Sequence, residues 1–178
     1  MGNEDKIEIV RYRSEWKDWF EILSNIYIEN LGDLVEKTEH VGSTAVEGMW
    51  AKPLIDIDLV IEDYAKFSEV KKKLFELGYD HEGDYGIEGR EAFRRKDKKV
   101  PWDNTGRIKH EHNLYVCPKD SRELKRHISF RDHLKKNEKC RNEYNRLKKE
   151  LARKYRFDRE AYTEGKTKFI ERILENIS

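Results

Sequence analysis

The chain has 178 residues, and 37 lysines and arginines against 36 aspartates and glutamates leave a formal net charge of +1. Such a balance provides no overall field that would attract nucleic acid, so we do not expect nucleic acid as a partner. Two cysteines without metal-type spacing, Cys117 and Cys140, favour a reduced, cytoplasmic protein. No apolar stretch is long enough to cross a membrane. We expect residues 1–178 to form a single domain.

The first part of the chain alternates helical and strand patterns. A helix is expected from Ser14, which can cap it, to about Glu29, and a short strand is expected to end at Gly42. An apolar run over residues 53–61 predicts a second strand. A helix over residues 63–77 follows, with Gly78 as its C-terminal cap.

Strands are expected next at residues 79–81, 92–95 and 108–116. After Pro118, the pair Asp120 and Glu123 resembles a capping box, and three helical patterns fill the rest of the chain, the last capped by Asp158. These patterns predict an α+β fold. Residues 7–117 would form a small mixed β-sheet flanked by helices, and residues 118–178 a helical part packed against it.

Two carboxylates lie one residue apart inside the apolar run. Alternate residues of a strand share a face, so Asp56 and Asp58 point to the same side while Ile55 and Ile57 point to the other. Two neighbouring anions on a buried strand need a compensating partner, and a divalent cation such as Mg²⁺ suits oxygen ligands. Pairing with lysines or with solvent at a strand end is the alternative.

A glycine turn precedes these carboxylates by about a dozen residues. In Gly42-Ser43-Thr44, backbone N–H groups and the Ser43 hydroxyl could approach a phosphate closely. The turn is not a Walker A loop, because no Gly-Lys-Ser/Thr follows at the required offset. The turn and the Asp-x-Asp strand together resemble the signature of the nucleotidyltransferase superfamily, which has the fold of DNA polymerase β.

A closer resemblance extends over nearly the whole chain. The segments that carry it are Trp16, His40–Gly48, Ala51–Asp56, His112–Val116, Phe130–Leu134 and Tyr162–Lys166. Together they resemble the GrpB family, usually placed within the nucleotidyltransferase superfamily. The resemblance implies a nucleotidyltransferase-like sheet and a metal-dependent reaction with a nucleoside triphosphate (NTP).

The resemblance implies that Asp56 and Asp58 hold Mg²⁺ or Mn²⁺. The turn at Gly42, Ser43 and Thr44, aided by Lys52 and Lys166, would bind the nucleotide phosphates. A nucleoside monophosphate would then pass from the NTP to an unidentified small acceptor. The alternatives are a non-catalytic nucleotide-binding or regulatory module of the same fold and, third, an RNA-interacting protein.

The third carboxylate of the superfamily has no evident counterpart. Glu111 is the only acidic residue of the predicted 108–116 strand, and strand parity places it on the face opposite to His112. Only one of the two can face the metals. The family motif includes His112 and leaves out Glu111, which favours the histidine face.

Overall fold

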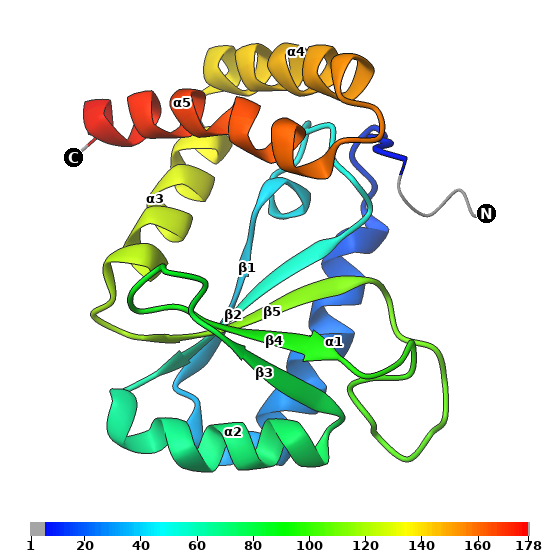
Figure 1. The fold of residues 1–178 in the computed structure, drawn as a ribbon, viewed down its shortest axis with the longest axis vertical. Helices are drawn as coiled ribbons and strands as arrows, with labels where there is room; N and C mark the ends of the chain where they lie inside the picture. Colours follow the sequence, from blue (N-terminus) through cyan, green and yellow to red (C-terminus); the bar gives the residue numbers. More distant parts are fainter. Residues whose placement is uncertain (1–5, 178) are drawn as a thin grey trace.

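Five strands form one mixed sheet in the computed structural model, which describes residues 6–177 (Figure 1). The strands are β1 (Lys37–Val41), β2 (Ile55–Ile61), β3 (Tyr79–Gly83), β4 (Glu91–Arg95) and β5 (His112–Pro118). Their order across the sheet is β1-β2-β5-β4-β3. The α+β class and the mixed sheet predicted from the sequence are thereby confirmed. The predicted single domain includes residues 1–5 and 178, which lie outside the described residues.

The two central strands, β2 and β5, run parallel, whereas the other neighbouring strands are antiparallel. In this register Asp56 lies beside Asn113, and Asp58 lies beside Tyr115. Because side chains alternate between faces, all four of these side chains lie on one face of the sheet. The pairing of β2 with β5 therefore decides which residues surround the two aspartates.

The opposite face of the sheet carries the larger part of the apolar core. Helices α1 (Glu15–Leu31) and α2 (Phe67–Glu76) cover this face. Trp16, Leu23 and Tyr27 of α1 are fully buried against Ile55 and other apolar side chains of the sheet. Burying a side chain of this size contributes about 1.5–3 kcal/mol relative to its exposure, so this contact fixes the orientation of β2.

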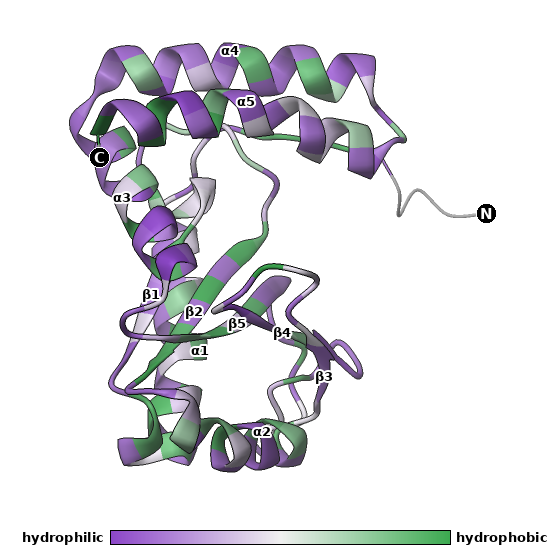
Figure 2. Ribbon diagram, turned by 60° about the vertical axis from the view of Figure 1, so that its left-hand side comes forward, coloured by the Kyte–Doolittle hydropathy of each residue, from purple (hydrophilic) through white to green (hydrophobic). Residues whose placement is uncertain are grey.

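The C-terminal helices lie on the side of the aspartates. They are α3 (Arg122–Lys136), α4 (Glu138–Lys154) and α5 (Arg159–Ile177), and Figures 1 and 2 both show α4 and α5 side by side above the sheet. Asp158 accepts a hydrogen bond from the Ala161 N–H, as its capping role predicts. Within residues 6–177, no helix has both the length and the apolar character that a bilayer span requires.

Three details differ from the sequence-based prediction. The cap of α3 is the Ser121 hydroxyl, which accepts a hydrogen bond from Leu124 N–H, and not Asp120. The strand expected from residue 108 begins at His112, because the backbone before it is held by Lys109 N–H donating to the Lys98 carbonyl. Ser14, expected to cap α1, precedes that helix, but its side chain makes no capping hydrogen bond to the described residues.

His112 lies on the core face, where its ring forms one end of a hydrogen-bonded row that continues through two tyrosine hydroxyls. Its Nδ1 lies 2.7 Å from the His110 carbonyl, so Nδ1–H donates and Nε2 accepts from the Tyr79 hydroxyl at 2.5 Å. The Tyr79 hydroxyl lies in turn 2.6 Å from that of Tyr27. Burial lowers the pKa of His112 to about 4, so the imidazole is neutral at pH 7.

We predict that stability decreases in acid partly through His112. Its folded-state pKa of about 4 is below the ordinary 6.5, so the unfolded chain takes up the proton first. The contribution is constant above about pH 6.5 and is lost as pH falls towards 4, by up to about 1.4 kcal/mol per pH unit. Urea unfolding of wild type and His112→Gln between pH 7 and 4 should show a shallower slope in the variant. Parallel slopes would contradict the assignment.

Candidate functional site

The candidate site is centred on Asp56, in the middle of the sheet. Its Oδ1 accepts a hydrogen bond of 2.8 Å from the Asn113 amide, the neighbour in register on β5. Burial raises the pKa of Asp56, while the Asn113 hydrogen bond and the charges of His127 and Lys166 act in the opposite direction. Asp56 is thus a carboxylate fixed in orientation by an amide and surrounded by positive charge.

Gly42 lies directly against this carboxylate. Its φ of 74° is in the left-handed region that favours glycine, and a Cβ atom at this position would overlap Oδ2 of Asp56. The turn therefore needs glycine for two reasons: its backbone conformation and the close approach of the aspartate. The short 3₁₀ turn Ser43–Ala45 follows immediately, and Ser43 lines the same cavity as Asp56.

A cavity of about 290 Å³, which we call the Asp56 cavity, opens above these residues. The polar and charged side chains that line it are Ser43, Thr44, Lys52, Asp56, Asn113, Tyr115, Lys148, Arg159, Tyr162, Thr163 and Lys166. Five of the residues predicted from the sequence, Ser43, Thr44, Lys52, Asp56 and Lys166, are thus brought together in one cavity. Four of the lining side chains are cations, and Asp56 is the single carboxylate among them.

Lys148 is the most deeply buried of these cations, with 2% of its surface exposed. Its ammonium group donates to the Ser43 hydroxyl at 3.0 Å and to the Trp50 carbonyl. Burial lowers its pKa well below the ordinary value. Because the Ser43 oxygen accepts from Lys148, its own hydrogen stays available for an acceptor in the cavity.

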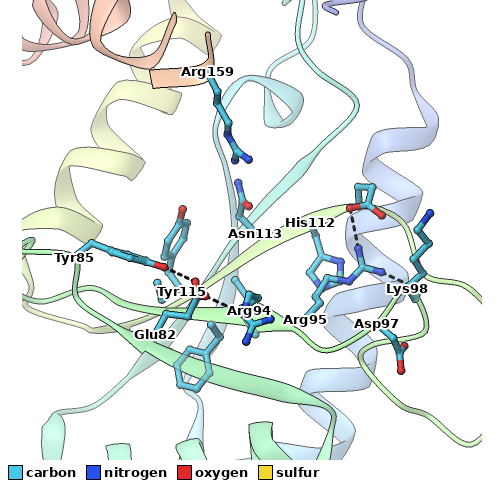
Figure 3. Close-up of a pocket in the computed structure, with 14 residues that line it drawn as sticks. Glu82, Tyr85, Arg94, Arg95, Asp97, Lys98, His112, Asn113, Tyr115 and Arg159 are labelled. Carbon is cyan, nitrogen blue, oxygen red and sulfur yellow. Dashed lines mark hydrogen bonds and ion pairs between the residues drawn. The ribbon is translucent and has the colours of Figure 1, made fainter. Parts of the chain in front are cut away.

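Lys166 and Lys52 approach from the other side, and each lies over the ring of Tyr162. The pKa of Lys166 falls to about 8, mainly because burial disfavours its charged form; Asp56 raises it, and the charges of Lys52 and Arg159 lower it. Arg159, the first residue of α5, extends down towards Asn113 (Figure 3). These cations repel one another, which is an arrangement suited to a multiply charged anion.

Thr44 lines the cavity, but its hydroxyl is already used inside the protein. Its Oγ1 donates to the Leu54 carbonyl at 3.1 Å, so the 3.0 Å contact with His40 must be a bond donated by His40 Nε2. Thr44 is 2% exposed. Its side chain therefore supports the turn, and of the two hydroxyl residues Ser43 is the one that can donate into the cavity.

Asp58, on the same face of β2, has a different environment. Its side chain is fully buried, and its Oδ2 lies 2.7 Å from Nδ1 of His127, whose Nε2 lies 3.3 Å from Glu123. Burial alone would lower the pKa of His127, but the hydrogen bonds to the two carboxylates outweigh it and raise the pKa to about 9. His127 is thus a cation between two anions.

The structure corrects the prediction for the third carboxylate position. His112 points to the core and bonds to Tyr79, so the favoured histidine face is not the face of the two aspartates. Glu111 precedes β5, has a side chain that is 64% exposed, and pairs with Arg95 at 3.1 Å. The residue beside Asp56 is Asn113, a neutral amide. The alternation of side chains along the strand placed Glu111 and His112 on opposite faces. It could not show which of these faces lies on the side of the aspartates.

Several residues of this site were not predicted as site residues from the sequence, among them Asn113, Tyr115, His127, Lys148 and Arg159. One signal existed for Lys148, which follows Tyr144 by four residues and so shares the apolar stripe of its helix. A lysine in such a stripe indicates a buried cation with a partner. Within the described residues, no group of three or more histidine, cysteine, aspartate or glutamate side chains is arranged to hold a metal ion.

Comparison with known proteins supports the family suggested by the motifs. A family model described as GrpB protein matches residues 6–176. The glutamate-rich protein GrpB of Alkalihalophilus pseudofirmus is 33% identical over 178 residues, which cover 98% of either chain. The UPF0157 protein YqkA of Bacillus subtilis is 28% identical over 171 residues, 96% of this chain and 47% of YqkA.

Solved structures agree with this result. The conserved protein GrpB from Enterococcus faecalis matches with a TM-score of 0.80 and 28% identity, over 96% of both chains. The poly(U) polymerase Cid1, in complex with the UTP analogue UMPNPP, matches with a TM-score of 0.52 and 9% identity, over 82% of this chain and 43% of Cid1. At that identity the likeness shows a shared nucleotidyltransferase-like fold. The chain belongs to the GrpB family.

Proposed function

We propose that this protein binds a nucleoside triphosphate, with the phosphates in the Asp56 cavity. The observation that carries the proposal is the set of four cations that surrounds a single carboxylate beside the Gly42-Ser43 turn. A mutually repelling group of this kind is stabilised when an anion with several charges binds. The cavity volume of about 290 Å³ is at the small end for ligand sites, which suits a phosphate chain with the nucleoside outside it.

Each part of the cavity has a defined task in this proposal. The Ser43 hydroxyl, held by Lys148, donates to a terminal phosphate oxygen, and the backbone N–H groups of the turn add to it. Lys166 and Lys52 neutralise the phosphates from the side of α5. Asn113 keeps the Asp56 carboxylate turned in a fixed direction.

One Mg²⁺ or Mn²⁺ ion fits this arrangement when it arrives with the nucleotide. Mg²⁺ is usually held by one or two carboxylates together with substrate phosphates. Asp56 lines the cavity, and the Oδ1 atom of Asp58 is buried without a hydrogen-bond partner among residues 6–177. Asp56 would hold the ion, with Asp58 as the second oxygen donor. The ion would neutralise charge on the phosphates next to the carboxylate.

Transfer of a nucleoside monophosphate to a small acceptor is a second candidate function. It is favoured by the nucleotidyltransferase-like fold and by the two carboxylates on one face of β2. Cid1, which shares the fold, was solved with a UTP analogue. Catalysis would come from alignment of the reacting groups and from the cations that receive the leaving pyrophosphate. Asn113 cannot act as a base, and this residue favours the alternative of a nucleotide-binding or regulatory module.

We predict that Lys166→Met weakens NTP binding at pH 7 by about tenfold or more, because a hydrogen bond to a charged group is lost. The variant should stay folded, since it loses one of several repelling cations. Calorimetry with UTP and ATP measures the effect. Lys168→Met is the matched control, because Lys168 is an exposed residue of the same helix. Equal affinities for wild type and Lys166→Met would contradict the proposed phosphate site.

We predict that Asp56→Asn abolishes the gain in NTP affinity that Mg²⁺ or Mn²⁺ provides. Binding in EDTA should persist, because the substitution also removes a negative charge that faces the phosphates. Titrations with and without metal separate the two effects. Glu111→Gln, a change at an exposed carboxylate outside this cavity, should keep the full metal effect. A metal effect that survives in Asp56→Asn would show that the ion lies elsewhere.

Pyrophosphate release distinguishes the two candidate functions. Each NTP is incubated with Mg²⁺ or Mn²⁺ and pools of small metabolites, and the pyrophosphate formed is measured. If the protein is a transferase, one pool should give release that depends on both the pool and Asp56. Tight NTP binding with no release from any pool would favour the binding or regulatory module.

A further inference from the structure

A second cavity adjoins the Asp56 cavity. It has a volume of about 590 Å³ and extends along β4 and β5 from Arg159 to Lys98 (Figure 3). We call it the Arg95 cavity after the guanidinium group in its wall. Asn113, Tyr115 and Arg159 line both cavities. The two spaces therefore meet beside the Asp56 carboxylate, to which Asn113 is bonded.

The charged groups of the Arg95 cavity are only partly paired with one another. Arg94 pairs with Asp80 and Glu82, and Arg95 pairs with Glu111. The side chains of Lys98 and Arg159 are exposed, and neither has an ion-pair or hydrogen-bond partner among the described residues. Asp97, which also lines the cavity, accepts hydrogen bonds from the Lys99 N–H and the Trp102 indole N–H. The two charges without a partner of either kind are both positive, so this cavity favours an anionic group.

The position of the phosphate-binding residues gives the two cavities different roles. Ser43 and Lys148 line the Asp56 cavity and are absent from the walls of the Arg95 cavity. In phosphoryl and nucleotidyl transfer, the attacking and leaving oxygens lie roughly in line on opposite sides of the phosphorus. A pyrophosphate held at Ser43 and Lys148 would leave on one side of Asp56. The acceptor must then come from the other side, where Asn113 opens into the Arg95 cavity.

We infer that the Arg95 cavity binds the acceptor, and that this acceptor is a small hydroxylated compound with a phosphate group. Lys98 binds its phosphate at one end of the cavity, and its hydroxyl lies at the other end, near Asn113 and Arg159 (Figure 3). The hydroxyl oxygen forms a bond to the α-phosphorus, the bond from that phosphorus to the bridging oxygen breaks, and pyrophosphate leaves with the electron pair. The hydroxyl proton passes to water in the open cavity. The role as acceptor rests on the proposed function, whereas the binding site can be tested by itself.

The test uses ribose 5-phosphate as the probe, with ribose as its uncharged counterpart. Binding to the whole protein is measured by calorimetry, alone and with UMPNPP present at saturation. We expect ribose 5-phosphate to bind in both conditions, and ribose to bind much more weakly. Lys98→Glu should weaken ribose 5-phosphate binding on the order of tenfold and leave UMPNPP binding unchanged. Lys99→Glu is the control, because Lys99 is exposed in the same turn but does not line the cavity.

The outcomes separate this inference from the proposed function. Absence of ribose 5-phosphate binding, equal effects of the two lysine substitutions, or displacement of the probe by UMPNPP would overturn the second site. Failure of UMPNPP to bind, with the Lys98-dependent binding of ribose 5-phosphate intact, would overturn the NTP site and leave the anion site established.

Discussion

The parallel pairing of β2 with β5 determines the rest of the site. It places Asn113 beside Asp56, and the amide holds the carboxylate at 2.8 Å in one orientation. That orientation brings Oδ2 against Gly42, where no side chain could be accommodated, and so fixes the position of the turn relative to the sheet. The remaining wall comes from α4 and α5, which contribute Lys148 and Lys166 to the same cavity. The site thus combines groups from five separate parts of the chain: the glycine turn, β2, β5, α4 and α5.

The positive charge of the Asp56 cavity is a cost to the folded protein. Lys148 and Lys166 both have lowered pKa values, chiefly through burial, which measures how unfavourable their charged forms are there. Natural sequences accept such local conflict where a ligand compensates for it. By contrast, Asp58 is compensated within the protein, since His127 lies between it and Glu123. Two aspartates that look equivalent in the sequence therefore differ. Asp56 lines the cavity, whereas Asp58 is fully buried, with Oδ2 paired to His127 and Oδ1 without a hydrogen-bond partner among the described residues.

Much of the fold and half of the site could be predicted from the sequence. The alternation in residues 53–61 placed Asp56 and Asp58 on one face, and the glycine turn has its predicted place beside them. Local patterns could not show which face of β5 lies on the side of the two aspartates. For this reason His112 was favoured and Asn113 was not. Contacts between segments far apart in the sequence could not be predicted either: His127 is 69 positions from Asp58, and Lys148 is 105 positions from Ser43. Such contacts depend on how α3 and α4 dock, and this is set by packing and not by spacing.

Helix α4 is fastened to the loop that follows the glycine turn, and this limits how the cavity can open. Asn145 accepts from the Trp50 N–H at 2.8 Å and donates to the Gly48 carbonyl at 2.9 Å, one turn before Lys148 reaches Ser43 and Trp50. A hinge motion that moved the helical layer away from the sheet would break all of these hydrogen bonds. Buried polar groups would then be left without partners. Access is therefore expected on the side of Arg159, an exposed residue that lines both cavities. Helix α4 is then a fixed wall of the cavity, and a ligand enters past the mobile side chain of an exposed residue.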